Sequence, residues 1–216
     1  MLEPVMRNIL ESESLLRQGL CDIFGSAILF TEKSSDFDLF PSELGNKTVF
    51  QPAAVLIPII IDDEEPFVVF TRRAKNLRHH PGQIAFPGGK VEPSDSSAME
   101  TAIRESFEEI QLKAIDINIL GNLPQHDTVT GYSILPFVAI IKNYKKLVPK
   151  LSEVSEIFKV PLKFLLTKKN MQVQIYKFNG FERGYYAIPY GPYYIWGATA
   201  RIIKTLADLI EKYEKI

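Results

Sequence analysis

The chain has 216 residues, of which 46% are hydrophobic and 24% are charged, and its formal net charge at pH 7 is −1. This composition suits one medium-sized domain with a buried core and argues against wholesale disorder. Because the charges nearly balance, the sequence excludes non-specific nucleic-acid binding through bulk charge. A few local Arg, Lys and His side chains could still hold a small anionic ligand.

Cysteine content and hydropathy bear on the compartment. Cys21 is the only cysteine, so neither an internal disulfide nor a cysteine-rich zinc site is expected, which fits a reducing environment. The first ten residues lack a basic start followed by an apolar run, and the run AAVLIPIII at 53–61 is too short to span a bilayer. We therefore expect a cytoplasmic protein with no membrane partner.

The N-terminal part of the chain is expected to combine a helix with a pair of strands. Apolar spacing predicts a helix over residues 5–24, followed by a loop that holds a short helix at 41–44. The runs at 53–61 and 67–73 predict two strands joined by the acidic turn DDEEP. Pro58 removes one backbone donor from the first strand, which predicts a bulge or an edge position.

A Gly- and Pro-rich stretch follows and leads into a second helix. It is expected to be mostly loop, with a short strand at 83–86 and the helix over 98–113. Ser96 or Ser97 is placed to cap that helix, because a hydroxyl there accepts a hydrogen bond from an otherwise unpaired amide. Asp95 would add a negative charge near the positive end of the helix dipole.

The C-terminal half mixes strands and helices without regular alternation. Strands are expected within 117–127 and 133–142, and a hairpin is expected around a turn at Asn179 and Gly180. An amphipathic helix is predicted over 197–213. This pattern favours an α+β sheet layered with helices over a doubly wound fold.

The stretch RESFEEIQL at 104–112 crowds three glutamates into five positions of the predicted helix. Glu105, Glu108 and Glu109 share one face at i, i+3, i+4 spacing, where like charges are mutually destabilising. The opposite stripe, which we predict to be buried, consists of Met99, Ile103, Phe107 and Ile110.

Two explanations of this acidic face are open from the residues alone. One is a solvated surface, and the other is a divalent cation such as Mg²⁺ or Mn²⁺, for which carboxylate oxygens are suitable ligands. The face carries no histidine, which disfavours zinc. Arg104 is either an ordinary surface residue or a fork that holds a neighbouring carboxylate in one orientation.

Two glycines, Gly88 and Gly89, precede this helix in FPGGK. Alone they predict an ordinary turn or a close backbone approach to a ligand. Joined to the helix, however, the stretch GGKVEPSDSSAMETAIRESFEEIQL at 88–112 resembles the Nudix box. Five residues match the pattern of that box: Gly89, Arg104, Glu105, Glu108 and Glu109.

The stretch also departs from the pattern. Asp95 stands where Glu is usual, and eight residues instead of seven separate it from Arg104; both departures are typical of one branch of the family. Ser106 replaces an aliphatic residue, and Gln111 replaces a glycine. Because a glycine there would permit a left-handed helix end, the last change bears on the helix exit and removes no metal ligand.

A second signature indicates the branch. The stretch VFTRRAKNLRHHPGQIAFPGG at 69–89 is similar to the upstream motif of the coenzyme A pyrophosphatases, with Ala74 where Ser is usual. The matching residues are Thr71, Arg72, Arg73, Leu77, His80, Gly82, Ile84, Phe86 and Pro87. Softer similarity extends the resemblance over about 53–200.

The resemblance implies a fold and a domain organisation. We expect an α+β fold, a Nudix-type α/β/α sandwich in which a mixed β-sheet lies between helices. Residues 51–216 would form this hydrolase domain. Residues 1–50 would form a helix and loop extension packed on it.

The resemblance also implies a reaction, the metal-dependent hydrolysis of the diphosphate linkage of coenzyme A or its thioesters to 3′,5′-ADP and 4′-phosphopantetheine or its acyl derivative. Glu105 and Glu109 would be the main ligands of Mg²⁺ or Mn²⁺, with the Gly88 carbonyl as a further ligand. Glu108 would hold another cation or orient the attacking water, and Arg104 would organise the carboxylates.

The substrate contacts and the general base are less narrowly implied. Gly89 and the positive side chains of Arg72, Arg73 and His80 would bind substrate, with Arg78 as a further candidate, although at least one arginine is expected to be merely solvated. The general base would be a glutamate of the box or a loop residue such as Glu153 or Glu156, for which a solvated loop is an equal explanation. The aromatic run YYAIPYGPYYIW at 185–196 would flank an adenine ring or the pantetheine arm, or else serve core packing or a dimer contact.

Two further functions compete with this one. The same chemistry could act on ADP-ribose, a dinucleotide or a nucleoside triphosphate. Alternatively, a non-catalytic Nudix module could sense a nucleotide, but such a binder has no evident need for three clustered carboxylates. In each case the partner is a small molecule, and the oligomeric state stays open, with a homodimer as one option.

Overall fold

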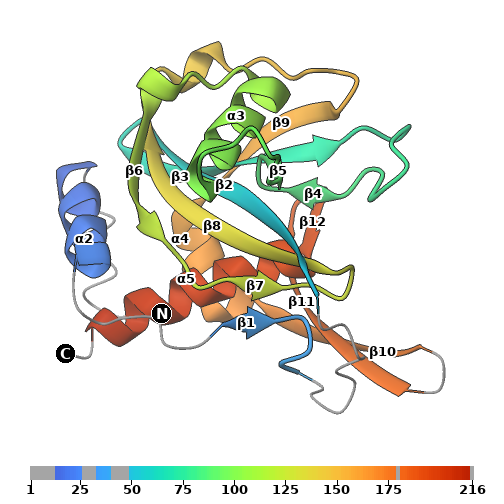
Figure 1. Ribbon diagram of the computed structural model, residues 1–216. Helices are drawn as coiled ribbons and strands as arrows, with labels where there is room; N and C mark the ends of the chain where they lie inside the picture. Colours follow the sequence, from blue (N-terminus) through green and yellow to red (C-terminus); the bar gives the residue numbers. More distant parts are fainter. Residues whose placement is uncertain (1–12, 26–32, 40–48, 179–180, 215–216) are drawn as a thin grey trace.

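The computed structural model describes residues 13–25, 33–39, 49–178 and 181–214. Within them, a mixed β-sheet lies between helices (Figure 1). Helix α3 (Ala98–Ile110) packs on one face of the sheet, and α4 (Leu162–Leu166) and α5 (Ala198–Glu214) pack on the other. The expected α+β class, with helices on both faces of a mixed sheet, is therefore confirmed.

The main sheet is built around two long strands, β2 and β8, which pair in parallel. Its order is β1-β7-β8-β2-β3-β4, while β5 pairs with β2, β6 with β8 and β9 with β3. The strands are β1 (Ser34–Ser35), β2 (Gln51–Asp62), β3 (Glu65–Arg73), β4 (Ile84–Ala85), β5 (Gly88–Lys90), β6 (Ile117–Asn122), β7 (His126–Asp127), β8 (Tyr132–Ile141) and β9 (Val154–Pro161).

The prediction of a bulge or an edge position at Pro58 is wrong. Strand β2 lies inside the sheet, and its register with β8 runs unbroken through the pair Pro58 and Ala139. The N–H of Leu56 donates to the carbonyl of Pro87, so the nitrogen of Pro58, two residues on, faces the same side of β2. On that side pairing with β5 ends before Pro58 and pairing with β3 begins after it. The missing donor therefore has little effect on the sheet.

A small antiparallel sheet is formed by β10 (Gln172–Phe178), β11 (Phe181–Tyr190) and β12 (Tyr193–Trp196). The predicted hairpin is thus confirmed, although its turn at Asn179 and Gly180 lies outside the described residues. In Figure 1 this sheet extends away from the end of the molecule that carries α3.

The remaining helices are short or peripheral. Helix α2 (Glu13–Gly25) packs beside β6, whereas residues 5–12 of the predicted N-terminal helix and the short helix expected at 41–44 lie outside the described residues. Single 3-10 turns are found at η2 (Ala114–Asp116), η3 (Tyr144–Lys146) and η4 (Lys168–Asn170). No helix in the described ranges is long and apolar enough to cross a membrane.

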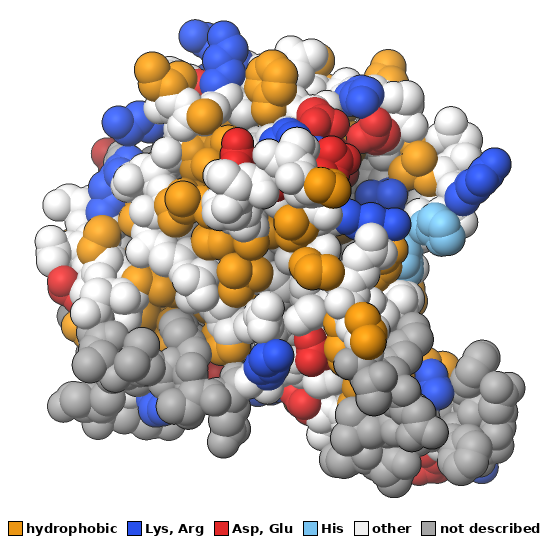
Figure 2. Space-filling view, in the orientation of Figure 1, with side chains coloured by type: hydrophobic (Ala, Val, Ile, Leu, Met, Phe, Trp, Pro, Cys, Tyr) orange, Lys and Arg blue, Asp and Glu red, His pale blue; other side chains and the backbone are white. Residues whose placement is uncertain are grey.

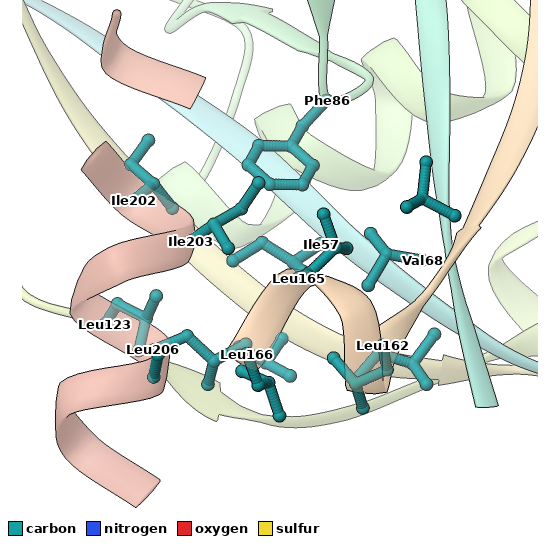
Figure 3. Close-up of a cluster of buried hydrophobic side chains, with 14 of the residues drawn as sticks. Ile57, Val68, Phe86, Leu123, Leu162, Leu165, Leu166, Ile202, Ile203 and Leu206 are labelled. Atoms are coloured by element: carbon teal, nitrogen blue, oxygen red, sulfur yellow. The ribbon is translucent and has the colours of Figure 1, made fainter. Parts of the chain in front are cut away.

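Alternating side chains of the sheet build two hydrophobic clusters, one on each face. On strand β3, Val68 and Phe70 join the larger cluster, whereas Val69 joins the cluster beneath α3. Figure 3 shows the larger cluster, where apolar side chains of the sheet meet those of α4 and α5. Its labelled members are Ile57, Val68, Phe86, Leu123, Leu162, Leu165, Leu166, Ile202, Ile203 and Leu206.

The buried face of α3 differs from the predicted stripe. Of the four predicted residues only Ile110 is buried, while Met99 is 42% and Phe107 is 52% exposed. The face toward the sheet instead carries small or polar side chains, among them Ala102 and Ser106. Small residues let the helix approach the sheet closely, so packing distance overrode the apolar periodicity that the prediction used.

Both ends of α3 have defined caps. The Ser97 hydroxyl accepts a hydrogen bond from the Glu100 N–H at 3.2 Å, which confirms one of the two predicted caps. At the other end Gln111 adopts the left-handed conformation, with φ 54° and ψ 28°. The helix therefore ends in the left-handed conformation that a glycine would adopt easily at this position. Glutamine adopts it here although its Cβ makes the conformation costly.

Candidate functional site

Arg104 lies at the centre of a hydrogen-bonded cluster on α3. Its Nε and Nη2 donate to the two carboxylate oxygens of Asp95 at 2.9 and 3.0 Å. Its Nη1 donates to Oε1 of Glu105 and to Oε1 of Glu108, both at 3.1 Å, and Nη2 reaches the Lys90 carbonyl at 3.3 Å. One guanidinium therefore orients two of the three glutamates and ties α3 to β5.

Glu109 does not share the exposed face that we expected for the three glutamates. It is only 4% exposed, and its Oε2 accepts a hydrogen bond from the Gly88 N–H at 3.3 Å. Its Oε1 lies 3.8 Å from Nη1 of Arg73. Burial raises the pKa of Glu109 to about 8, against the opposing effects of Arg73 and the Gly88 amide. The rotation of α3 that buries Ala102 also turns this carboxylate toward β5.

Glu105 lies directly against the Gly-Gly strand. A Cβ added at Gly89 would stand 2.4 Å from Cδ of Glu105 and 2.4 Å from its Oε1. At Gly88 an added Cβ would stand 2.4 Å from the Ala54 carbonyl oxygen, on the neighbouring strand β2. A side chain at Gly88 would therefore clash with the backbone of β2, and one at Gly89 would displace the Glu105 carboxylate, so the two glycines bring the backbone of β5 to the glutamates without any intervening side chain.

A loop beyond α3 adds a fourth carboxylate to this region. The N–H of Lys150 donates to the Glu109 carbonyl at 2.9 Å, which fixes the loop to the end of the helix. Burial raises the pKa of Glu105, and the charges of Glu108 and Glu153 contribute to the increase. The charge of Glu153 also contributes to the raised pKa of Glu109. The charge of Glu153, which pairs with Lys150 at 2.6 Å, therefore reaches the same site.

The two arginines of strand β3 lie on opposite faces of the sheet. Arg73 faces Glu109, whereas Nε of Arg72 lies 3.4 Å from Oε2 of Glu156, with its guanidinium 5.2 Å from the ring centre of Tyr193. The Tyr193 hydroxyl donates to Oε1 of Glu156 at 2.7 Å, and its ring stacks on that of Phe158 at 3.7 Å. Arg72 is therefore held by an acidic and an aromatic partner from β9 and β12.

The other positive residues of the second signature lie on the loop between β3 and β4. Arg78, His79 and His80 are exposed, and His80 adopts a positive φ of 55° in a turn that its carbonyl closes with Gln83. In the space-filling view, Lys or Arg side chains border the acidic group and histidines lie on the same face (Figure 2). In the described structure no hydrogen bond or ion pair joins Arg78 or His80 to the acidic cluster.

The carboxylate oxygens of this cluster are chemically suitable ligands for a hard divalent cation. Within the described ranges, no three Asp, Glu, His or Cys side chains already converge on a point that could hold a metal ion. Glu105 and Glu108 turn toward Arg104, and Glu109 turns toward Gly88. The site nevertheless offers oxygen ligands only, and the charge of Glu105 raises the pKa of Glu109. A cation between these two carboxylates would remove that repulsion.

Two partners in the site were missed from the sequence. Asp95 was interpreted as a dipole charge, but the hydrogen bonds from Arg104 hold the pKa of its carboxyl well below its ordinary value. The backbone of Lys90 was not considered, and it accepts from the same guanidinium. Neither partner of Arg104 can be found from helical spacing, because Asp95 and Lys90 both precede the helix.

A separate polar cluster was also missed. His126 is fully buried, with Nδ1 2.9 Å from the Ser34 hydroxyl and Nε2 3.0 Å from Oδ1 of Asp36. These contacts join segments about ninety residues apart in the chain, so no local pattern could indicate them. They fasten β1 to β7, and they share no residue with the acidic cluster.

The helix-covered mixed sheet, with glutamates on the helix that follows a Gly-Gly strand, defines a Nudix-type fold. A MutT/nudix family protein from Enterococcus faecalis has the same fold, with a TM-score of 0.50 and 13% identity over 98% of this chain and 76% of that one. The NUDIX domain model matches residues 50–170. The chain belongs to the Nudix hydrolase family.

Relatives named Nudix hydrolase NudL support this assignment. The protein of that name from Yersinia enterocolitica is 38% identical over 159 residues, which cover 73% of this chain and 80% of the relative. The one from Enterobacter sp. is 37% identical over 155 residues, which cover 72% of this chain and 80% of the relative. The expectation of a hydrolase is confirmed, in preference to a non-catalytic binding module.

Proposed function

We propose that this protein hydrolyses the diphosphate linkage of coenzyme A or of its thioesters with the help of Mg²⁺ or Mn²⁺. The observation that carries this proposal is the buried Glu109 carboxylate, which lies between the Gly88 amide and Arg73 and beside Glu105. Such a group is unfavourable for the isolated fold and suits a site that receives a cation and an anionic substrate together.

The carboxylates would hold the cation. Glu105 and Glu109 would be the main ligands, with the Gly88 carbonyl as a further one and Glu108 near a second cation or the attacking water. When bound, the cation would neutralise charge on the diphosphate oxygens and acidify a bound water. Arg104 acts on the same step through position, because it holds Glu105 and Glu108 at fixed orientations.

Arg73 is best suited to bind the substrate diphosphate. Its Nε is buried and has no hydrogen-bond partner, while its Nη1 faces Glu109. A phosphate oxygen at this point would satisfy that donor and pair with the guanidinium. Gly89 would admit the diphosphate close to the backbone, whereas Arg72 and His80 would contact more distant parts of the substrate.

We propose Glu153 as the better-placed loop candidate for the general base, with a glutamate of the box as the alternative. The charge of Glu153 acts on both Glu105 and Glu109, so it lies close to the proposed reaction centre. Glu156 is engaged by Arg72 and by the Tyr193 hydroxyl on the other face of the sheet. A base must come within hydrogen-bond reach of the attacking water, directly or through one further water.

Coenzyme A is proposed as substrate on the strength of the signature at 69–89, and ADP-ribose is the alternative. The resemblance on which this choice rests also bears on the organisation of the chain. We propose that residues 51–216 form the hydrolase domain with 1–50 as an extension, and that the protein works in the cytoplasm on a small molecule. A homodimer is compatible with these assignments.

The decisive experiment is a product analysis. Purified protein is incubated with coenzyme A, acetyl-coenzyme A or ADP-ribose in Mg²⁺ or Mn²⁺, and the products are identified by mass. We expect 3′,5′-ADP and a phosphopantetheine product, a higher kcat/KM for coenzyme A than for ADP-ribose, and loss of turnover with a chelator. Preferential cleavage of ADP-ribose would replace the substrate, and unchanged turnover in chelator would refute the metal-dependent mechanism.

A further inference from the structure

A hollow lined by aromatic side chains lies on the small sheet, away from the acidic cluster. It is a shallow hollow of about 70 Å³ that is open to solvent on one side, so a ligand would lie partly inside it and partly over its rim. Its lining residues are Asp36, Phe37, Val129, Tyr176, Arg183, Gly184, Tyr185, Trp196 and Gly197. Its lining shares no residue with the acidic cluster, and in Figure 1 β10 extends away from the end of the molecule that carries α3, so this hollow is separate from the proposed catalytic site.

One wall is a connected set of aromatic rings. Tyr185 meets Tyr176 edge to face at 5.8 Å between ring centres and Trp196 at 5.2 Å. The strand register explains this wall, because Tyr176 pairs with Arg183 and Trp196 pairs with Ala187, which places these side chains on one face of the small sheet. Tyr176 and Trp196 are 43% and 38% exposed, and none of the three rings belongs to the two hydrophobic clusters.

The opposite wall carries a carboxylate that is held in place. Asp36 Oδ1 lies 3.0 Å from Nε2 of the buried His126, and its Oδ2 accepts from the Val129 N–H at 3.0 Å. A carboxylate has about four acceptor positions, so each oxygen can take one more donor. The side chain of Asp36 is 18% exposed, and it lines the hollow.

We propose that this hollow is a second binding site, for a flat aromatic ring that carries an amino group, such as the base of a nucleoside. The rings of Tyr176, Tyr185 and Trp196 offer stacking surfaces, and the Asp36 carboxylate accepts from the amino group. The hollow contains one arginine and one aspartate, so its charges balance. An uncharged ligand suits it better than the polyanion for which the site on α3 is built.

The single tryptophan gives this proposal a direct readout. Trp196 is the only tryptophan in the chain, so its fluorescence reports occupancy of the hollow. Adenosine is titrated while tryptophan is excited at the red edge of its absorption, where adenosine does not absorb. We expect saturable quenching, about tenfold weaker affinity for Tyr185→Ala and unchanged affinity for Phe107→Ala, which removes an exposed ring on α3.

A second variant tests the recognition of the amino group. It keeps the proposal testable if Tyr185→Ala does not fold. Asp36→Asn is compared with the wild type for adenosine and for purine riboside, which lacks the amino group. The wild type should prefer adenosine, and the variant should lose most of that preference, because an amide oxygen is a weaker acceptor than a carboxylate. A wild type without that preference, or an adenosine signal that Tyr185→Ala leaves unchanged, would overturn the proposal.

The catalytic site is excluded by a parallel assay. Adenosine at concentrations that saturate the quenching should leave the KM for the diphosphate substrate unchanged. Competitive inhibition with the same constant as the quenching would place adenosine in the catalytic site and refute a second site. Because the fluorescence titration needs no turnover, its outcome is independent of whether coenzyme A proves to be the substrate.

Discussion

The guanidinium of Arg104 is anchored by Asp95, nine residues earlier, through two parallel hydrogen bonds of 2.9 and 3.0 Å. The remaining amino group of the fork is thereby left to hold Glu105 and Glu108. An arginine that is itself fixed can orient carboxylates without losing much further conformational freedom. Asp95 is therefore a positioning residue for the acidic cluster, although it is not expected to touch the substrate.

Asp95→Asn should lower the melting temperature at neutral pH and make the melting temperature less dependent on pH in the acidic range. The folded pKa of Asp95 lies below its ordinary value of 3.8, because Arg104 favours the charged form. The resulting stabilisation is complete above that ordinary value and is lost as the pH falls through the folded value. Thermal unfolding from pH 7 to pH 2 should therefore show the wild type and the variant converging in acid. A constant difference at all pH values would contradict this account.

Glu109→Gln should separate activity from stability. The change removes a proposed cation ligand, so kcat/KM in Mg²⁺ should fall roughly a hundredfold or more. Because burial already disfavours the charged form of Glu109, the uncharged amide should leave the metal-free protein at least as stable. The measurements are initial rates and thermal unfolding of the same preparations. Glu100→Gln, on the same helix but outside the cluster, is the control, and normal turnover of Glu109→Gln would remove Glu109 from the metal site.

Gly89→Ala should impair turnover while the fold persists. The new methyl group would stand 2.4 Å from the Glu105 carboxylate, and this side chain would have to move away from β5. Gly25→Ala is the matched control, since a Cβ at Gly25 meets nothing within 4 Å. Rates and circular dichroism of both variants are compared with the wild type. If Gly89→Ala keeps full activity, Glu105 need not occupy its present position during the reaction.

Gln111→Gly should stabilise the protein by about 1 kcal/mol. Gln111 ends α3 with a φ of 54°, a conformation that costs a residue with a Cβ but not a glycine, while the greater freedom of glycine in the unfolded chain offsets part of the gain. For a chain of this size the melting temperature should rise by about 2–4 °C. Asn143→Gly, at a φ of 52°, should gain less because asparagine tolerates this conformation better. A loss of stability in Gln111→Gly would show that the glutamine side chain compensates for the strain.

Tyr193→Phe should raise KM severalfold with little change in kcat. The lost hydroxyl donates to Glu156 at 2.7 Å, and Glu156 in turn holds Arg72, the proposed contact to a distant part of the substrate. The ring stacked on Phe158 is kept, so packing should not change. Steady-state kinetics on coenzyme A are compared with those of Tyr194→Phe, which loses a hydroxyl on the other face of the same strand. Equal KM values in all three proteins would mean that Arg72 does not bind the substrate.

The sequence determined the local parts of the site. The spacing of Arg104 and Glu108 on a helix is sufficient to bring the guanidinium to the Glu108 carboxylate, because residues four positions apart on a helix are neighbours. The Gly-Gly pair before the helix, the Ser97 cap and the pair of strands joined by the DDEEP turn follow from similarly short-range signals. These signals were enough to identify the family before any contact was known.

The tertiary structure decided what is buried and which distant segments meet. Apolar periodicity assigned Met99 and Phe107 to the core, but the close approach of α3 to the sheet selected Ala102 and Glu109 instead, because only small side chains or a hydrogen-bonded one fit there. No local pattern could place Glu153 near the glutamates. Its position depends on a loop that is held by the hydrogen bond from the Lys150 N–H to the Glu109 carbonyl, about forty residues earlier in the chain. Contacts of this kind depend on how the elements pack, and packing is a property of the whole chain.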